Sequence, residues 1–405
     1  MGKRALIGPS GLSKRSLGSE RIAWRVILPA FLATTAGILP GFLNAGLAVQ
    51  IRADLGLSLS RLGALIGLFF AVSGLVSPVA GRWSERLGWA TSLRISVSLS
   101  ALSLLGIAWL GRDLPTLSVF LVIGGIGGAL GQVSSNLAVA RCVAGERLGF
   151  VFGLRHASVP AAAALAGAAV PGIALTVGWR WAFVGGALLA VIAGVAVPAS
   201  EQRYSVNSPT PAGASPGRPA TSMKLLVILS IAVGVGIAGV DGFTAFLVSY
   251  SVDIGFGETS AGLLLTVGSI TGMTARLVFG WLIDFVHWRD LTTIAAMMAI
   301  GGAGVVVLNL GGTTGLLVGG MVVFAAGWGW SGLFTYAVVR ANPGAPASAS
   351  GVTQVGKYFG AATGPPLFGF IAENASFHVA YWFTTSVLVL AAFLILYVRN
   401  QRVNE

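Results

Sequence analysis

The sequence predicts an all-α membrane protein whose twelve transmembrane helices form two pseudo-symmetric six-helix bundles. Three observations support this fold class. Of the 405 residues, 55% are hydrophobic and only 9% are charged, whereas about 25% of the residues of a soluble domain are charged. Apolar segments long enough to cross the hydrocarbon core of a bilayer, which takes about 20 residues, recur along the chain. Features of the first half return in the second half at a nearly constant offset.

The predicted helices are the apolar segments between short polar breaks. Their approximate ranges are 26–49, 60–81, 90–110, 115–140, 149–175, 180–198, 224–252, 259–283, 290–309, 313–339, 348–371 and 377–398. We expect residues 26–198 to form the first bundle and residues 224–398 the second, between tails at 1–25 and 399–405. The segment 199–223 is rich in Ser, Pro, Gly and Ala, a composition that predicts a flexible linker.

Lys and Arg residues are concentrated on one predicted side of the membrane. Because the number of helices is even, both tails lie on the same side, and that side carries eighteen Lys and Arg residues. The opposite side carries four, which are Arg52, Arg61, Arg112 and Arg180. Basic loops mark the cytoplasmic face, so we expect both termini in the cytoplasm. This bias accounts for most of the formal net charge of +12, and no nucleic-acid partner is needed to explain it.

An internal repeat relates the two predicted bundles. Gly81 near the end of the second helix and Gly280 near the end of the eighth are 199 residues apart, and an acidic residue stands four positions after each glycine. The same offset relates AVAR at 138–141 to AVVR at 337–340. Several matches in register indicate duplication of a six-helix unit. Two parallel repeats form an architecture in which the halves of a secondary transporter rock about a central site.

The segments after the second and eighth helices carry the loop motif Gly-x-x-x-Asp-Arg-x-Gly-Arg-Arg in a modified form. The first copy consists of Gly81, Glu85, Arg86 and Gly88, followed by Trp89 and Ala90 in place of the last two basic residues. The weaker second copy consists of Gly280, Asp284 and Arg289. With these motifs and the repeat, nearly the whole chain resembles the major facilitator superfamily.

The resemblance implies a major facilitator fold with a cytoplasmic gate at these motifs. Glu85 and Asp284 would lie near helix N-termini of the opposite bundle, where a carboxylate is stabilised. The residues expected at this gate are Gly81, Glu85, Arg86, Arg141, Gly280, Asp284 and Arg340. The alternative is a solvated loop of acidic and basic residues without a gating role.

Ionisable residues inside the apolar segments mark the candidate site. They are Arg155, Asp241, Arg276 and Lys357, and His156 stands beside the first of them. A charge in the middle of a transmembrane helix costs about 2.5–3.5 kcal/mol on insertion scales, so such residues face a partner or an aqueous cavity. The resemblance implies that the fifth, eighth and eleventh helices lie at or beside a central cavity. Three cations against one acid favour an anionic ligand there.

Two of these cations carry a finer resemblance. Arg276, in the segment ARLVFG, is similar to the eighth-helix arginine of the monocarboxylate and oxalate/formate transporters, and Lys357 is similar to the eleventh-helix lysine of the latter. Gly272 stands where the monocarboxylate branch often has an acid. Structural roles are the alternatives: Arg276 could support the gate, and Arg155 could reach the cytoplasmic surface.

The remaining candidates have two interpretations each. Asp241 could pair permanently with Arg276 or Lys357, or it could take up a proton during transport. His156 titrates near neutral pH and is a second candidate for proton coupling, or a hydrogen-bonded packing residue. Gln132 could donate or accept hydrogen bonds to a ligand or serve helix packing. The aromatic residues Tyr358 and Trp330 could line the cavity or belong to the core. The predicted binding residues are thus Arg276, Lys357, Arg155, Gln132 and Tyr358, with Asp241 and His156 for proton coupling.

Two other functions were weighed. Exporters of drugs or lipophilic cations need a membrane-embedded acid without opposing cations and typically carry Gly-Pro-x-x-Gly-Gly in the fifth helix, where this chain has Val159-Pro160-Ala161. A membrane-embedded enzyme would need paired acids or metal-ligand spacing of His, and the sequence has neither. We therefore predict no catalytic residue, no metal and no cofactor. The expected protein is a monomeric carrier of a small organic anion in a lipid bilayer, and its short outer loops favour a bacterial inner membrane.

Overall fold

The computed structural model describes residues 10–142, 148–199, 220–283, 285 and 290–404. All regular secondary structure in this part of the chain is helical. The elements are α1 (Ser10–Gly46), α2 (Ala48–Leu55), α3 (Leu59–Leu87), α4 (Trp89–Leu110), α5 (Leu114–Cys142), α6 (Leu148–His156), α7 (Ser158–Ala169), η1 (Val170–Ala174), α8 (Trp179–Ala196), α9 (Met223–Asp253), α10 (Glu258–Ile283), α11 (Asp290–Asn309), α12 (Gly312–Val322), η2 (Val323–Gly327), α13 (Ser331–Ala341), α14 (Pro346–Asn374) and α15 (Phe377–Asn404).

Most helix ends match the predicted membrane spans to within a few residues, but α1 begins well before residue 26, and α3 and α15 continue past residues 81 and 398. Among the described residues, eleven helices or helix runs are long and apolar enough to cross a bilayer. The twelfth predicted span corresponds to α14, which has 29 residues but is rich in Gly, Ser, Thr and other polar residues. Its length equals that of α3, against which it packs. The predicted all-α, twelve-helix membrane fold is confirmed; the short helix α2 was not predicted.

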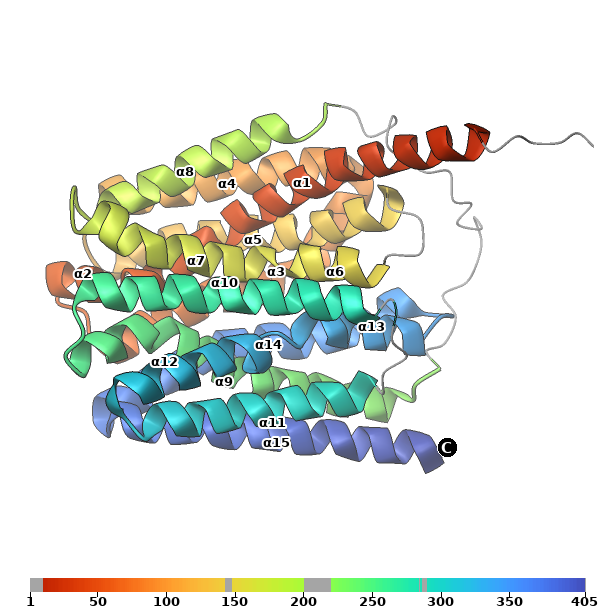
Figure 1. The fold of residues 1–405 in the computed structure, drawn as a ribbon. Helices are drawn as coiled ribbons and strands as arrows, with labels where there is room; N and C mark the ends of the chain where they lie inside the picture. The colour runs from red at the N-terminus through yellow and green to blue at the C-terminus, as the bar shows by residue number, and fades with distance from the viewer. Residues whose placement is uncertain (1–9, 143–147, 200–219, 284, 286–289, 405) are drawn as a thin grey trace, which may run out of the picture.

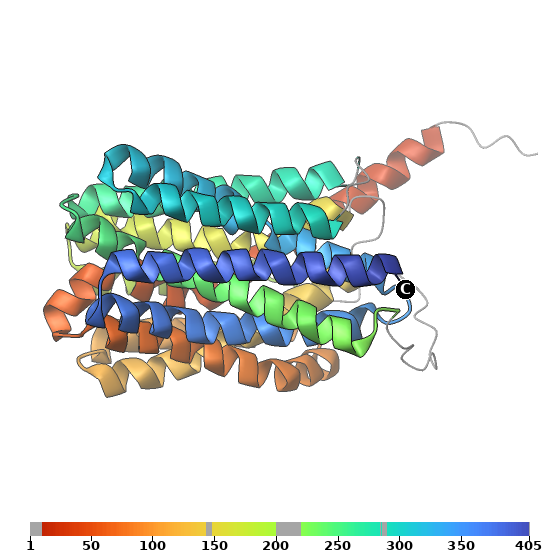
Figure 2. The ribbon, with the colours of Figure 1, turned by 90° about the horizontal axis from the view of Figure 1, so that it is seen from below.

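The helices run side by side along one long axis (Figures 1 and 2). In Figure 1, α1, α4, α5, α7 and α8 lie in the upper part of the molecule, and α9, α11, α12, α14 and α15 lie in the lower part. The two groups meet where α7 and α6 pack against α10 and where α3 packs against α14. The start of α1 and the end of α15 lie at the same end of the molecule, which we call the terminal end.

Close backbone contact joins the two groups of helices. At the crossing of α7 and α10, a Cβ atom on Gly167 would lie 2.6 Å from the carbonyl oxygen of Gly262. Small residues permit this approach, and packing of this kind drives helix association in a membrane. At the end opposite the terminal end, the Glu373 carboxylate of α14 accepts a hydrogen bond from the backbone N–H of Ser60 in α3, at 2.7 Å. Gln50 and Glu258 make a second hydrogen bond between the groups there, at 2.6 Å.

Two predicted spans are interrupted helices. The span predicted at 149–175 consists of α6, α7 and the π-helix η1, and Pro160 stands just after the break between α6 and α7. The span predicted at 313–339 consists of α12, η2 and α13, with turn residues at 328–330. Interruptions leave backbone carbonyls without their usual helical donors, and such carbonyls must find other partners inside a membrane.

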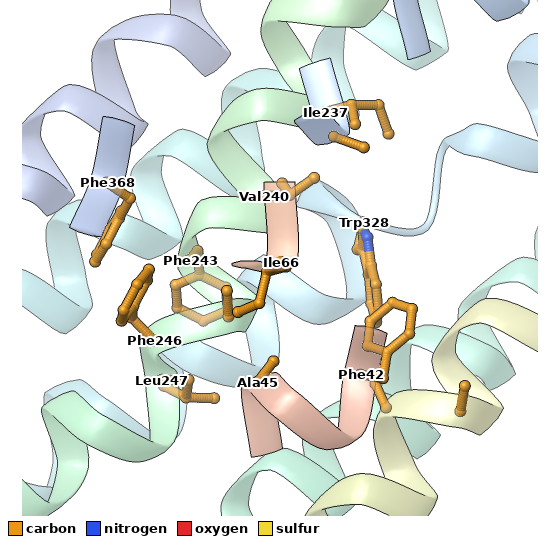
Figure 3. Close-up of a cluster of buried hydrophobic side chains, with 14 of the residues drawn as sticks. Phe42, Ala45, Ile66, Ile237, Val240, Phe243, Phe246, Leu247, Trp328 and Phe368 are labelled. Atoms are coloured by element: carbon orange, nitrogen blue, oxygen red, sulfur yellow. The ribbon is translucent and has the colours of Figure 1, made fainter. Parts of the chain in front are cut away.

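A large apolar core lies between the interrupted helices and α9. Phe42 of α1 faces Trp328 across the boundary between the two groups, with ring centroids 6.2 Å apart (Figure 3). Phe246 of α9 stacks on Phe368 of α14, with centroids 5.3 Å apart. Phe42 and Trp328 also line the cavity described next, so the aromatic core borders it directly.

Candidate functional site

A cavity of about 100 Å³ lies in the middle of the molecule, between the two groups of helices. It is lined by all four ionisable residues that the sequence places inside the membrane: Arg155, Asp241, Arg276 and Lys357. His156 lines it as well. We call this cavity the central chamber. Residues from helices α6, α9, α10 and α14, far apart in the sequence, are thus brought to one place.

Arg276 is held by the two interrupted helices. Its Nη1 donates a hydrogen bond to the carbonyl oxygen of His156 at 2.6 Å, and Nη2 and Nε donate to the carbonyl oxygen of Trp328 at 2.9 and 3.2 Å. Pro160 has no backbone N–H, so the His156 carbonyl four residues earlier lacks a helical donor. The Trp328 carbonyl lies in the turn between η2 and α13. Arg276 therefore supplies donors to both freed carbonyls and joins α6 to α13.

The Arg276 guanidinium also stacks on Trp328. Its central carbon lies 4.9 Å from the centroid of the indole ring. The side chain is only 3% exposed. A guanidinium has five N–H groups, and three of them donate to the carbonyls named above. The structural alternative for Arg276 is therefore realised in part, although the residue also faces the chamber.

Arg155 is buried against Gln132 and His156. Its Nη2 donates to the side-chain oxygen of Gln132 at 2.5 Å and to the backbone carbonyl of the same residue at 3.2 Å. Its Nη1 lies 3.2 Å from Nε2 of the His156 ring. The Nε atom is buried and has no hydrogen-bond partner among the described residues. Arg155 is 9% exposed, so the expectation that it could reach the surface is wrong.

Lys357 and Asp241 each contact a neutral side chain. The Lys357 ammonium donates to the hydroxyl of Thr335 at 2.9 Å and lies 5.4 Å from the centroid of the Phe334 ring. One Asp241 carboxylate oxygen accepts a hydrogen bond from the indole N–H of Trp328 at 3.3 Å. The chamber cations therefore bind neutral groups in the part of the chain that the structure describes.

In the part of the chain that the structure describes, the chamber contains no side-chain ion pair within 4.0 Å. Among the described residues, the side-chain ion pair within 4.0 Å is that of Arg180 with Asp54, outside the membrane-embedded region. The static pairing of Asp241 with Arg276 or Lys357 is not found at that distance. Trp328 contacts both residues instead: its indole N–H donates to the Asp241 carboxylate, and its ring stacks on the Arg276 guanidinium.

Several lining residues were missed or misassigned from the sequence. Tyr358 and Gln132 line the chamber as predicted, but Trp330 does not: its indole N–H donates to the carbonyl of Gly327 at 2.7 Å inside the core. Trp328 lines the chamber instead. Both tryptophans stand in the segment GWGW. Because the turn at 328–330 interrupts the helix, helical periodicity could not predict which of the two faces the chamber. Gln354 also lines the chamber and was missed.

The predicted gate residues lie at the terminal end. Glu85 and Arg86 are exposed near the end of α3, and no ion pair of Glu85 is found among the described residues. Arg141 and Arg340 are exposed in the last turns of α5 and α13, and the latter lies 6.0 Å from the ring centroid of Tyr336.

The glycines of the gate motif differ in their packing. Gly280 is buried, and a Cβ on Gly153 would come 3.5 Å from its Cα, so α6 and α10 are in close contact there. A Cβ atom on Gly81 would lie 3.8 Å from the nearest atom, which belongs to the side chain of Val133, so the packing there is looser. Asp284 and Arg289 lie outside the described residues. The gating role stays a prediction.

The comparison with known families agrees with this architecture. The family description "Major Facilitator Superfamily" matches residues 27–365. The chain belongs to the major facilitator superfamily. It is thus a multi-pass membrane protein of a transporter family.

Individual relatives are more distant. The chain is 26% identical to human monocarboxylate transporter 11 over 346 residues, which cover 81% of this chain and 72% of that protein. The fold is similar to that of a D-xylose–proton symporter, with a TM-score of 0.73, 16% identity and coverage of 92% and 97% of the two chains. The human organic anion transporter MFSD10 (TETRAN) gives a TM-score of 0.67, 16% identity and coverage of 93% and 99%. The two solved structures support the fold alone.

Proposed function

We propose that this protein is a secondary active transporter that moves a small organic anion, a mono- or dicarboxylate, by alternating access. The observation that carries the proposal is the composition of the central chamber: Arg155, Arg276 and Lys357 face it together with the single acid Asp241. Transport leaves the substrate chemically unchanged, so the proposal requires no catalytic group in the chamber.

The electrostatics of the chamber favour an anion. Removing a cation from water costs several kcal/mol unless a partner of opposite charge offsets the loss. The cations here bind carbonyl, amide and hydroxyl oxygens, which are neutral acceptors. The buried Nε of Arg155 has no acceptor among the described residues, and the ammonium of Lys357 has three N–H groups, one of which donates to Thr335. A carboxylate bound among these groups would accept the remaining hydrogen bonds and neutralise part of the charge.

Coupling is assigned to protons or to anion exchange. Asp241 shares Trp328 with Arg276, so a change in its charge acts directly beside the binding cations. His156 contributes its ring to Arg155 and its carbonyl to Arg276. These positions make both residues suitable proton sites in a cycle where protonation and anion binding favour one another.

The orientation in the membrane follows from charge. With the positive-inside bias of the sequence, the terminal end is cytoplasmic and the gate motifs lie on the cytoplasmic side. We assign the rocking units to residues 26–198 and 224–398, joined by the linker at 199–223. A monomer in a bacterial inner membrane is the simplest assembly for this arrangement. The similarity to a protein named monocarboxylate transporter 11 supports the choice of substrate class.

The test is uptake by the purified protein in liposomes. Labelled carboxylates, sugars and lipophilic cations are compared under an imposed pH gradient and in exchange mode. Lys357→Gln removes the chamber charge but keeps a donor for Thr335, and Lys224→Gln, at an exposed position at the start of α9, is the matched control. We expect a carboxylate to be transported and its KM to rise about 10- to 100-fold in Lys357→Gln, because a hydrogen bond to a charged group contributes about 1.5–3 kcal/mol.

The control variant should transport like the parent protein. Uptake of lipophilic cations with no carboxylate transport would instead favour the exporter alternative. Carboxylate uptake that is unaffected by Lys357→Gln and by Arg276→Gln would remove the basis of the anion assignment.

A further inference from the structure

A second cavity adjoins the central chamber on the side of the membrane lipids. It is a groove of about 720 Å³ between α3, α5 and α14. Apolar side chains dominate its walls, among them Leu75, Pro78, Val133, Val355 and Phe359. Leu75 is 80% exposed and Phe359 is 69% exposed, so the groove is open to the hydrocarbon that surrounds the protein.

Glycines bring α3 and α14 into close contact beside the groove. Toward the end opposite the terminal end, a Cβ atom on Gly63 would lie 2.5 Å from the carbonyl oxygen of Pro365, and one on Gly67 would lie 2.5 Å from that of Ala362. These glycines let the two backbones touch. Nearer the terminal end the helices stay close, since a Cβ atom on Gly74 would lie 2.8 Å from the Cβ of Tyr358. The groove lies beside this contact, on the lipid side, between residues 71–78 and 351–363.

Groove and chamber share a wall. Gln354 and Tyr358 line both cavities. On α5, Gln132 lines the chamber and the next residue, Val133, lines the groove. The side chains of Gln354 and Tyr358 therefore lie between a cationic cavity and an apolar one.

The two cavities complement the two parts of an amphipathic molecule. The chamber, at about 100 Å³, is smaller than the 300–1,000 Å³ of a typical ligand site, whereas the groove falls within that range. The chamber offers positive charge and hydrogen-bond donors, and the groove offers a mainly apolar surface whose lining, among the described residues, contains no acidic or basic side chain.

We propose that the transported anion is amphipathic: its carboxylate binds Arg155, Arg276 and Lys357 in the chamber, and its aliphatic tail lies in the groove between α3 and α14. The inference rests on the proposed function and narrows its substrate class to medium-chain monocarboxylates. Tyr358 moves aside to let the tail join the head.

The test measures binding as a function of chain length. The protein is placed in nanodiscs, and its thermal stabilisation is titrated with straight-chain monocarboxylates of increasing length, from propionate to decanoate. We expect the apparent affinity to rise about fourfold for each methylene group buried. Nanodiscs replace detergent because a detergent chain would compete for the groove.

A pair of variants locates the tail. Val355→Trp places a large side chain in the groove at an exposed position of α14. Val195→Trp makes the same change at an exposed position of α8, where the residue is 83% exposed and lies outside the groove. We expect Val355→Trp to abolish the gain in affinity with chain length, and Val195→Trp to behave like the parent protein at every chain length.

The outcomes separate this inference from the proposed function. If short acids bind and affinity is flat or falls with chain length, the amphipathic substrate is excluded while the anion carrier stands. If the gain persists in Val355→Trp, the tail lies outside the groove, and the proposal is equally overturned. If no acid of any length stabilises the protein, both the inference and the proposed function fail.

Discussion

Replacing Arg276 by Lys separates its charge from its geometry. The substitution keeps a cation facing the chamber but removes the planar fork that reaches two carbonyls on different interrupted helices. In the structure Nη1 donates to His156, whereas Nη2 and Nε donate to Trp328. The three N–H donors of a lysine are all on one nitrogen atom at the end of a flexible side chain. The lysine can therefore bind only one of these two carbonyls.

The cost follows from the carbonyl that is left without a partner. An unsatisfied buried acceptor costs about 1–3 kcal/mol, and the loss of guanidinium stacking on Trp328 adds up to about 1 kcal/mol. We therefore expect Arg276→Lys to lower the free energy of unfolding by about 1–4 kcal/mol. Part of this loss falls on the contact between α6 and α13, which joins the two groups of helices.

Arg94 provides the matched control. Its Nη2 alone donates to the carbonyls of Val197 and Pro198, at 3.0 and 2.8 Å. Because both bonds start from one nitrogen atom, a lysine ammonium can replace them. Arg94→Lys should change the free energy of unfolding by less than about 1 kcal/mol.

Both variants are compared with the parent protein by unfolding in mixed micelles, followed by circular dichroism without added ligand. We expect the free energy of unfolding to fall by a large amount in Arg276→Lys and by a small amount in Arg94→Lys. Equal stability of Arg276→Lys and the parent protein would refute the bridging role, as would equal losses in the two variants.

Three further outcomes are expected. Asp241→Asn should abolish accumulation driven by a pH gradient and spare anion exchange, because the amide takes up no proton; equal loss of both modes in a counterflow assay would contradict proton coupling through this residue. The hydrogen bond from Ser60 lowers the pKa of the Glu373 carboxyl, and Glu373→Gln should weaken this contact between the groups of helices. We then expect an impermeant reagent to label a cysteine introduced into the chamber faster than in the parent protein. Unchanged labelling would argue that this hydrogen bond does not hold the two groups together. The hydrogen bond from Arg180 lowers the pKa of Asp54, so its stabilisation is present above about pH 4 and is lost as the pH falls through the lower folded-state pKa. Because both partners are more than a third exposed, Asp54→Asn should cost less than about 1 kcal/mol at pH 7 and should flatten the acid limb of a stability–pH curve; an unaltered limb would count against the pair.

Prediction from sequence succeeded where the signal is local. Each membrane span is marked by its own apolar length, because every backbone group in lipid must be satisfied within its own helix. Ionisable residues in such spans stand out equally clearly, and Arg155, Asp241, Arg276 and Lys357 do line one chamber. Their common location could be inferred only through the family resemblance, since no local pattern relates α6 to α14.

Prediction failed where the partner is distant in the chain. A permanent ion pair was one of two interpretations of Asp241, and among the described residues its carboxylate instead accepts a hydrogen bond from the indole of Trp328. Its role in proton uptake stays a prediction. Arg155 was given a possible route to the surface, yet it is buried against Gln132. In both cases the neutral partner lies on another segment of the chain. Which side chain becomes the partner depends on how the interrupted helices are rotated about their axes.

The amino-acid sequence alone determined that this chain crosses the membrane about twelve times and that its membrane-embedded charge is mostly positive. Composition and periodicity suffice for these properties because lipid imposes them on each helix separately. The tertiary structure decided which carbonyls hold Arg276, which tryptophan faces the chamber, and that an apolar groove adjoins the cations. These features depend on close contacts between helices, such as the one at Gly67 of α3, where side-chain volumes from distant segments combine.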